Sequence, residues 1–346
     1  MRTVVVKASN KYNIYIDSGL LEKCGEIIRN DAGGRKAVVI TDTNIDKLHS
    51  QKVIESLEKN GYEVVKYVMP AGEENKNFDN LIKIVSFMAQ NRLSRKDIAV
   101  ALGGGVVGDI TGFAAAVYMR GIKFVQIPTT ILAAVDSSVG GKTAVDLPEG
   151  KNLAGAFYQP HAVICDTDCF ETLPERDYNN GFAEVIKYGM IADKDIFDML
   201  DMEIGAIVYK CVQIKADIVE EDEFESGKRQ ILNFGHSIGH AIEKASDFSM
   251  LHGEAVACGM VKVCDIAIAE GNCSPECREI LVKALAKYKL PVKADYDAKL
   301  LAEIMKMDKK ASGDSINLVL PLNTGRVRIQ KTPLDELEGL IQIGDN

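Results

Sequence analysis

The chain has 346 residues, with 41 Lys and Arg against 50 Asp and Glu, a formal net charge of -9 and a pI near 5.3. This length predicts two domains, because a domain usually holds about 100–200 residues. The acidic balance argues against a nucleic-acid binder and against a protein held on anionic lipid. It does not exclude the binding of small anionic substrates, because a site can be locally positive on an acidic protein.

Membrane, targeting and disulfide signals are also missing from the sequence. No apolar run approaches the roughly 18–20 residues that span a bilayer, and residues 1–16 alternate like a strand instead of resembling a signal peptide. The eight cysteines are scattered without paired C-x-x-C spacing. These features predict reduced thiols in a cytoplasmic protein that has no membrane partner.

The first half of the chain alternates predicted strands and helices. Short β-rich runs predict strands at residues 36–41, 62–68, 97–102, 123–127 and 162–166. Helical spacing of apolar residues predicts helices at 44–60 and 77–91, and a third that follows a glycine-rich turn and ends near Val117. This alternation predicts a Rossmann-like α/β domain with a mostly parallel sheet over residues 1–165.

The second half is predicted to be mainly α-helical over residues 166–346. Helical periods run over 175–192, 194–221, 229–246, 252–270, 275–289 and 297–307. One late β-like stretch covers 316–330, with a turn at 323–325. The sequence therefore predicts two domains of different class.

A glycine-rich turn is the strongest local signal of the first half. Gly103-Gly104-Gly105-Val106-Val107-Gly108-Asp109 fits G-x-G-x-x-G, follows a predicted strand and opens a predicted helix. Backbone N–H groups and the helix dipole favour a pyrophosphate there, although a tight turn without a ligand is the alternative. The acid that a Rossmann fingerprint places after the next strand is missing, because that strand ends in Pro128. Asp42, after an earlier strand, would then serve the ribose in a variant arrangement.

Two Gly-Lys pairs follow, at Gly141-Lys142 and at Gly150-Lys151-Asn152. They suit contacts to phosphate or carboxylate, or they are solvated loop lysines. A Walker A site is not predicted, because its first glycine would fall on Asp136.

Three of the five histidines fall within residues 236–252. His236 and His240 are four residues apart and share one face of a predicted helix, while His252 begins the next helix. Glu184 offers a carboxylate from an earlier predicted helix. Two histidines and a glutamate with an open fourth position are typical of a catalytic zinc site. Three histidines are the competing ligand set, and polar histidines at a helix junction are the interpretation without a metal.

Basic and polar residues near these groups predict an anion clamp. They are Arg120, Lys187, Lys215, Arg229 and Asn233. Arg229 and Asn233 are four apart, so they are expected to share a helical face one turn before His236.

The chain resembles the 3-dehydroquinate synthases, within the sugar phosphate cyclase family, from Asp42 to residues 308–310. The motifs that carry this resemblance are Gly72-Glu73-x-x-Lys76, GGGVVGD, RGIKFVQIPTT, VDSSVGGKT, GKNLAGAF, ETLP, FAEVIKYG, NFGHSIGHAIE and HGEAVA. The resemblance implies an NAD-binding α/β domain, an α-helical domain and an active site in the cleft between them. It also implies a homodimer.

The resemblance assigns roles to individual residues. It implies Zn2+, with Co2+ as an alternative, held by Glu184, His236 and His252, which leaves His240 as an acid/base group. The implied NAD contacts are Asp42, Asn44, Glu73, Lys76, Gly104, Gly105, Val106, Asp109, Thr129, Thr130, Lys151, Cys169, Phe170, Glu171 and Thr172. The implied substrate contacts are Arg120, Asp136, Lys142, Asn152, Asn180, Lys187, Lys215, Arg229, Asn233 and one of Lys309 and Lys310. The implied catalytic residues are His240, Lys142, Glu225 and Arg229.

The implied reaction converts 3-deoxy-D-arabino-heptulosonate 7-phosphate, an anionic sugar phosphate, into 3-dehydroquinate and phosphate, a step of the shikimate pathway to aromatic amino acids. It joins transient oxidation by NAD, phosphate β-elimination, re-reduction and an intramolecular aldol closure. A sister cyclase such as a 2-deoxy-scyllo-inosose synthase is one alternative. A metal-dependent polyol dehydrogenase, which would produce NADH and release no phosphate, is the other.

Overall fold

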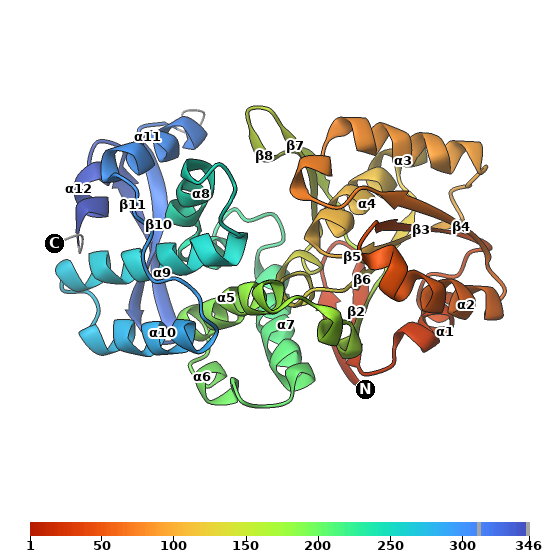
Figure 1. Ribbon diagram of the computed structural model, residues 1–346, viewed down its shortest axis with the longest axis horizontal. Coiled ribbons are helices and arrows are strands. Elements are labelled where there is room, and N and C mark those ends of the chain that lie inside the picture. Colours follow the sequence, from red (N-terminus) through yellow and green to blue (C-terminus); the bar gives the residue numbers. More distant parts are fainter. Residues whose placement is uncertain (310–312, 344–346) are drawn as a thin grey trace. The chain divides into compact units, whose positions relative to one another are not determined.

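The structure is a computed structural model that describes residues 1–309 and 313–343 (Figure 1). The chain forms two compact units. Unit 1 holds Met1–Pro174 and Glu203–Phe224, and unit 2 holds Glu175–Met202 and Glu225–Asn346. This division differs from the predicted boundary at residue 165, because the segment 203–224 makes its contacts within unit 1.

A seven-stranded sheet of order β1-β2-β9-β6-β5-β3-β4 forms the centre of unit 1. β1 and β2 pair antiparallel, and the other neighbours pair parallel. The strands are β1 (Arg2–Lys7), β2 (Lys11–Asp17), β3 (Lys36–Asp42), β4 (Glu63–Met69), β5 (Ile98–Gly103), β6 (Lys123–Pro128) and β9 (Ala162–Asp166). All residues of β5 and β9 are buried, as expected of parallel strands covered on both faces. The predicted mostly parallel α/β fold is confirmed.

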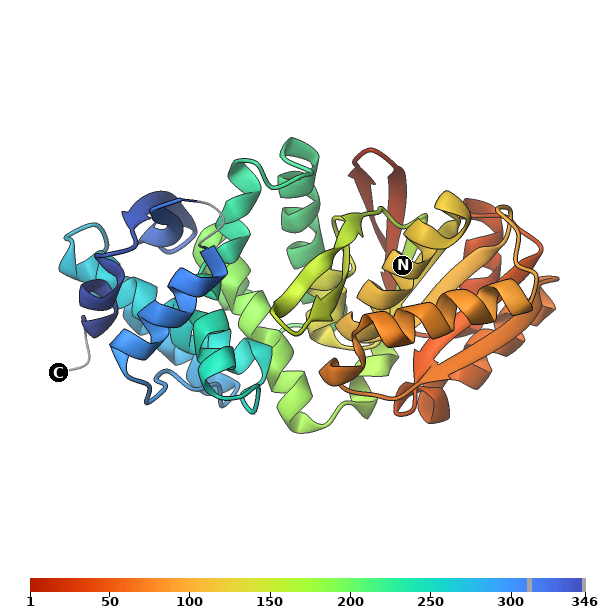
Figure 2. The ribbon, with the colours of Figure 1, turned by 90° about the horizontal axis from the view of Figure 1, so that it is seen from above.

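Five helices accompany this sheet in unit 1. They are α1 (Cys24–Asp31), α2 (Gln51–Lys59), α3 (Phe78–Gln90), α4 (Gly105–Val117) and α7 (Ile204–Glu221). α3 and α4 share a core with β3 and β5 that includes Ile84, Ile110 and Val38, and α7 packs on β1 and β2. Figure 2 shows α3 as the orange helix of unit 1, which packs against α4.

A second, smaller sheet in unit 1 is the hairpin of β7 (Lys142–Leu147) and β8 (Gly150–Phe157). The sequence predicts no strands here, only lysine-bearing segments. The strands pair closely, since a Cβ on Gly155 would lie 2.0 Å from the Thr143 carbonyl oxygen. Asp146 N donates to the Lys76 carbonyl oxygen at 2.8 Å. The hairpin is therefore tied to the segment between β4 and α3.

Unit 2 is mainly helical and carries one antiparallel hairpin, as the sequence predicts. Its elements are α5 (Glu175–Ile191), α6 (Ile196–Met199), α8 (His236–Ala245), α9 (His252–Ala269), α10 (Pro275–Lys287), α11 (Ala298–Lys309), β10 (Ser315–Asn323), β11 (Arg326–Pro333) and α12 (Leu337–Gln342). Nowhere in the described ranges is a helix both long and apolar enough to cross a membrane.

Two long predicted helices are interrupted. The predicted helix at 194–221 is divided into α6 and α7, and Glu203 caps α7 through its side chain and the Gly205 N–H. The predicted helix at 229–246 begins as a 3-10 helix at Lys228–Asn233 and restarts as α8 after Gly235, which has a left-handed φ of 77°. The shared α-helical face expected for Arg229 and Asn233 is therefore wrong, since a 3-10 helix repeats every three residues.

Candidate active site

The carboxyl ends of the parallel strands gather the predicted NAD residues of unit 1. β3 leads outward to β4, and the chain then returns to place β5 on the other side of β3. Ile40 of β3 pairs with Ala101 of β5, so Asp42 and Gly103 end the two strands at the same level. In open parallel sheets, ligands bind in the crevice at such a switch of direction. The structure therefore supports the variant arrangement, with Asp42 beside the glycine turn.

The glycine turn leads directly into the N-terminus of α4. Gly104 is its N-cap, and no side chain caps the first turn, so backbone N–H groups there are available to an anion. A Cβ on Gly108 would lie 2.6 Å from Gln126 Oε1 of β6, which explains why this helix start can approach the sheet so closely. Thr129 and Thr130 follow β6, and Thr129 N donates to the Gly103 carbonyl oxygen at 3.0 Å.

Lys76 connects the glycine turn with the β7–β8 hairpin. Its Nζ lies 2.5 Å from Asp109 Oδ2 and 2.5 Å from Asn152 Oδ1, and the residue is buried. Burial lowers the pKa of Lys76, but the charges of Asp109 and Glu73 outweigh it and raise this pKa above its ordinary value. Burial raises the pKa of Asp109. Lys151 Nζ lies 3.9 Å from Glu73 Oε1, so five residues from three motifs form one polar network.

A cavity of about 300 Å³ in unit 1 adjoins the last group of predicted NAD contacts. Its lining residues are Leu21, Leu48, His49, Lys52, Asp166, Asp168, Cys169, Glu171 and Thr172. His49 Nε2 lies 3.0 Å from Thr172 Oγ1, and burial lowers the pKa of His49. Sequence reasoning missed His49 and Lys52, although both lie in the predicted helix after Asp42.

The predicted substrate residues of unit 1 are not all brought together. Lys215 of α7 donates from Nζ to the Asp136 carbonyl oxygen and Oδ1 at 2.6 and 2.7 Å. Lys142 begins β7 and is exposed. Arg120 follows the C-terminus of α4, a 13-residue helix about 20 Å long, so it lies at the end of the helix opposite the glycine turn. The role predicted for Arg120 stays a prediction.

A close crossing of α8 and α9 places the histidines of unit 2. Gly235, before α8, has the left-handed φ, and a Cβ there would lie 2.8 Å from Met260 N of α9. A Cβ on Gly259 would lie 2.1 Å from the Gly235 carbonyl oxygen. Only glycine fits both positions, and the crossing brings the rings of His236 and His252 to a centroid distance of 5.2 Å.

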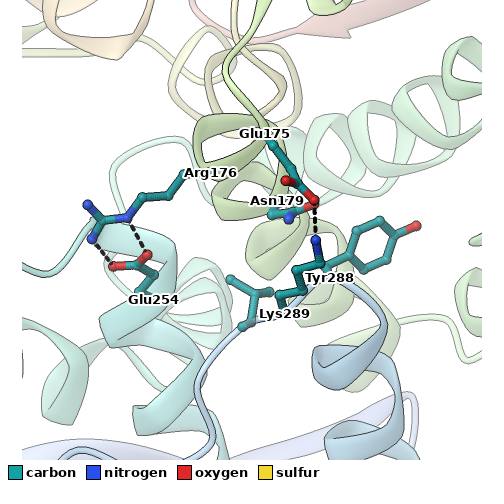
Figure 3. A pocket seen from close by; sticks show the side chains of 7 residues that line it. Glu175, Arg176, Asn179, Glu254, Tyr288 and Lys289 are labelled. Carbon is teal, nitrogen blue, oxygen red and sulfur yellow. Dashed lines mark hydrogen bonds and ion pairs between the residues drawn. The ribbon is translucent and has the colours of Figure 1, made fainter.

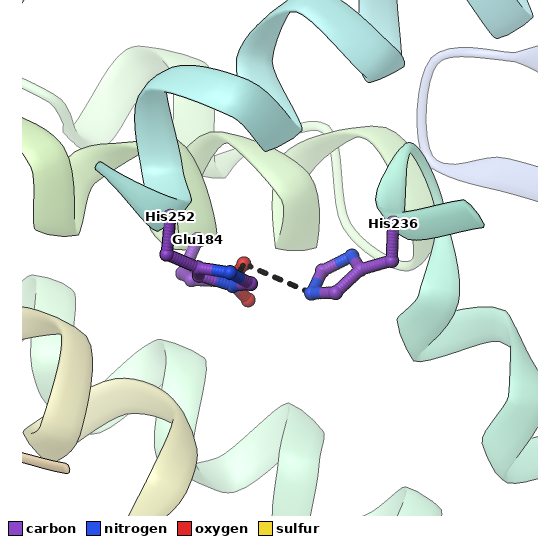
Figure 4. Close-up of side chains that lie close together, drawn as sticks. All are labelled: Glu184, His236 and His252. Carbon is purple, nitrogen blue, oxygen red and sulfur yellow. Dashed lines mark ion pairs between the residues drawn. The ribbon is translucent and has the colours of Figure 1, made fainter. Parts of the chain in front are cut away.

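Glu184, His236 and His252 form one cluster of candidate metal ligands (Figure 4). Glu184 Oε1 lies 3.4 Å from His236 Nε2 and 3.7 Å from His252 Nε2. One carboxylate oxygen and two imidazole nitrogens are a donor set that zinc prefers. The second ring nitrogens are also occupied, His236 Nδ1 by the Phe234 carbonyl oxygen at 3.1 Å and His252 Nδ1 by Glu243 Oε2 at 3.2 Å. These residues fit a divalent metal, because ligating histidines are normally oriented in this way.

The electrostatics of the cluster favour a cation. Burial and the nearby Lys187 charge lower the pKa of His236 to about 3, so its imidazole is neutral and able to donate an electron pair. Burial also lowers the pKa of His252, but hydrogen bonds to Glu184 and Glu243 outweigh it and raise this pKa to about 10. The carboxylates around His252 thus stabilise a positive charge at its ring. A bound metal ion can provide that charge in place of the proton.

His240 lies beside the cluster of Glu184, His236 and His252 but is not one of its members. It is exposed, whereas Glu184 is fully buried, and its ring lies 5.4 Å from that of His236 and 5.8 Å from that of His252. It belongs instead to a second group with Glu243 and His252. This position is compatible with the acid/base role that the resemblance implies.

Of the other predicted residues of unit 2, Lys187 contacts the cluster directly. Lys187 and Arg229 are each 1% exposed, and Lys187 Nζ forms an ion pair with Glu184 Oε2. Asn233 donates to Glu225 at 2.8 Å. Asn180 Oδ1 accepts from Gly253 N at 2.7 Å, so that this side chain caps α9. The Lys309 side chain and Lys310 lie outside the described residues.

A pocket of about 160 Å³ in unit 2 holds none of the predicted site residues (Figure 3). Its charges pair with each other: Arg176 Nη2 lies 2.7 Å from Glu254 Oε2, and Lys289 pairs with Glu175. We assign no role to it. In unit 2, sequence reasoning missed Glu243, although its spacing, three residues after His240, places it on the histidine face of α8.

The fold is shared with solved sugar phosphate cyclases. A crystal structure of 2-deoxy-scyllo-inosose synthase with carbaglucose-6-phosphate, NAD+ and Co2+ matches with a TM-score of 0.89 and 26% identity, over 98% of this chain and 99% of that chain. That protein therefore combines this fold with NAD and a divalent metal, the two cofactors that the sequence predicts here.

Two family models and curated relatives define the family more narrowly. The 3-dehydroquinate synthase N-terminal model matches residues 66–180, and the C-terminal model matches residues 181–311. The 3-dehydroquinate synthase of Clostridium kluyveri is 40% identical, over 99% of this chain and 98% of the relative. That of Clostridium acetobutylicum is 42% identical, over 97% and 98%. The chain belongs to the 3-dehydroquinate synthase family, as its motifs predict.

Proposed function

We propose that this chain converts 3-deoxy-D-arabino-heptulosonate 7-phosphate into 3-dehydroquinate and phosphate, and so acts as a carbon–oxygen lyase on a sugar phosphate. The observation that carries the proposal is the Glu184, His236 and His252 cluster in a member of this family. When bound, NAD exchanges a hydride with the substrate, and the divalent metal polarises substrate hydroxyl groups.

The substrate chemistry explains why one site can perform several steps. Oxidation of the C5 hydroxyl to a ketone acidifies the hydrogen at C6, so phosphate can leave by β-elimination. Reduction of the ketone, ring opening and an aldol addition within the molecule then give the carbocycle. No net oxidation occurs, because the hydride removed from C5 returns to it.

The side chains of this chain bind, orient and move protons. His240, exposed beside the cluster, takes the C5 hydroxyl proton with the help of water. Buried Lys187 and Arg229 hold anionic groups of the substrate and orient the reacting carbon atoms. In unit 1, Lys215 with Asp136 and Lys142 provide further contacts to the substrate.

The test is an assay with purified protein, NAD and Zn2+. With the heptulosonate phosphate we expect phosphate release and no accumulation of NADH. Phosphate release with glucose 6-phosphate as the only sugar substrate would favour a sister cyclase, which the 2-deoxy-scyllo-inosose synthase match makes the second candidate. Steady NADH formation with a polyol would contradict both. The homodimer and the cytoplasmic location stay predictions.

A further inference from the structure

Glu243 occupies a position between the candidate metal ligands and the candidate acid/base group. It lies in α8 and is 3% exposed, an unusual environment for a carboxylate. Its Oε2 lies 3.2 Å from His252 Nδ1, and its carboxylate groups with His240 and His252 within 4.8 Å. His252 therefore faces a carboxylate with each ring nitrogen, Glu184 with Nε2 and Glu243 with Nδ1.

His252 belongs to two groups of possible metal ligands, one with Glu184 and His236 and one with His240 and Glu243. It cannot serve as an ordinary ligand in both. An imidazole that binds a metal through Nε2 keeps its proton on Nδ1 and donates it to a neighbour. Glu243 Oε2 is placed to accept that hydrogen bond. The contact between Glu243 and His252 is therefore better explained as one that orients a ligand of the Glu184, His236 and His252 cluster than as part of a second metal site.

We infer that Glu243 is a positioning residue, which fixes the tautomer and ring orientation of His252 and thereby sets the metal affinity of the Glu184, His236 and His252 cluster. This inference rests on the metal site of the proposed function. A carboxylate that accepts the Nδ1 hydrogen bond stabilises the proton on Nδ1 by its negative charge. The imidazole then donates its Nε2 electron pair to a metal more strongly than it would with an amide acceptor at Nδ1.

The decisive variant is Glu243→Gln, which keeps the shape of the side chain and removes its charge. Glu254→Gln is the matched control, because Glu254 lies in α9 close to His252 in the sequence, and its carboxylate accepts hydrogen bonds from Arg176 and Leu251 N. Zn2+ affinity is measured for each by competition with a chromophoric chelator. We expect Glu243→Gln to weaken binding about 10–100-fold and Glu254→Gln to leave it within about threefold.

A second measurement separates positioning from folding. The melting temperature of each metal-free protein shows whether the variant is folded, and the imidazole nitrogen shifts of His252, recorded with Zn2+ bound, report which ring nitrogen carries the proton. We expect Nδ1 to carry the proton in the wild-type protein and a mixture of tautomers in Glu243→Leu. Wild-type affinity in Glu243→Gln, or an equal loss in Glu254→Gln, would overturn the inference.

Two further results show whether only this inference fails or the proposed function fails with it. They are the number of Zn2+ ions bound per chain and the Zn2+ affinity of His236→Ala. Two equivalents of Zn2+ in the wild type, with only one lost in Glu243→Gln, would make Glu243 a ligand and contradict a positioning role. If His236→Ala binds Zn2+ as tightly as the wild type, the metal site itself is wrong, and both proposals fail together.

Discussion

Lys215 Nζ binds Asp136 twice, at 2.6 Å from its carbonyl oxygen and 2.7 Å from Oδ1, and thereby joins α7 to the turn after β6. The Lys215 side chain is 6% exposed and that of Asp136 is 26% exposed. Removal of one member of a buried ion pair leaves the other charge without compensation. We therefore expect Lys215→Met to lower the free energy of unfolding by about 3 kcal/mol.

The double variant Lys215→Met/Asp136→Asn separates structure from function. It should recover most of the stability in a denaturant titration, because both members of the ion pair are then neutral. It should not recover phosphate release, because the proposed substrate contact is still missing. Recovery of both properties would show that the pair is only structural.

Gly235 is expected to tolerate no side chain. Gly235→Ala would combine a left-handed φ with a contact of 2.8 Å to Met260 N, so the α8–α9 crossing must open. Gly271→Ala is the control, because Gly271 has a φ of +71° and no atom within 4 Å of its would-be Cβ. We expect a loss of about 1 kcal/mol for Gly271→Ala and at least 2–3 kcal/mol more for Gly235→Ala, measured by chemical unfolding.

His236 and His240 are a matched pair on one helix. His236→Ala should lose the metal, whereas His240→Ala should keep the metal and lose rate. Saturating metal stabilises the folded state by about 2.7 kcal/mol at a concentration of 100 times Kd. Addition of a chelator should therefore lower the melting temperature of the wild type and of His240→Ala by several degrees, and leave that of His236→Ala unchanged. An equal loss of metal from both variants would contradict the ligand assignment.

Lys76 should couple the β7–β8 hairpin to the cofactor site. Lys76→Met removes the contacts to Asp109 and Asn152, which tie the glycine turn to the hairpin, and removes a positive charge that would attract a pyrophosphate. We expect NADH to bind at least about tenfold more weakly, a change of about 1.4 kcal/mol. Lys83→Met, on the exposed side of α3, should bind NADH normally in the same fluorescence titration.

His161 should make the protein less stable in acid. Burial, aided by the Lys123 charge, lowers the pKa of His161 to about 4 from the 6.5 of an unfolded chain. Between these values the unfolded state binds a proton that the folded state does not, so the free energy of unfolding falls as the pH falls from about 6.5 to 4. The contribution is below about 3 kcal/mol, because the side chain is partly exposed. His161→Asn should reduce the change in the free energy of unfolding between pH 6.5 and 4, measured by denaturant titrations at each pH. If the change is the same as in the wild type, other groups cause the acid sensitivity.

Local patterns predicted much of the fold and the cluster. The apolar runs of β3, β5, β6 and β9 could be recognised because parallel strands are buried on both faces. Spacing and residue type made His236, His240 and His252 candidate ligands, and only the family resemblance separated His240 from the other two. The β7–β8 hairpin could not, because its glycines and lysines look like a loop until the close strand pairing is known. The break before α8 depends on Gly235, where Met260 leaves no room for a side chain, and Glu243 becomes significant only once His252 is placed beside it.

The path of the chain between the two units limits how the protein can be divided. It passes from one unit to the other at three places, after Pro174, Met202 and Phe224, so neither unit is a continuous stretch of sequence. A gene fragment that stops at residue 174 would encode the sheet without α7 and would expose the apolar surface of β1 and β2 that this helix covers. Expression of a separate cofactor-binding fragment from this gene would thus require the segment 203–224 to be joined back by a designed linker.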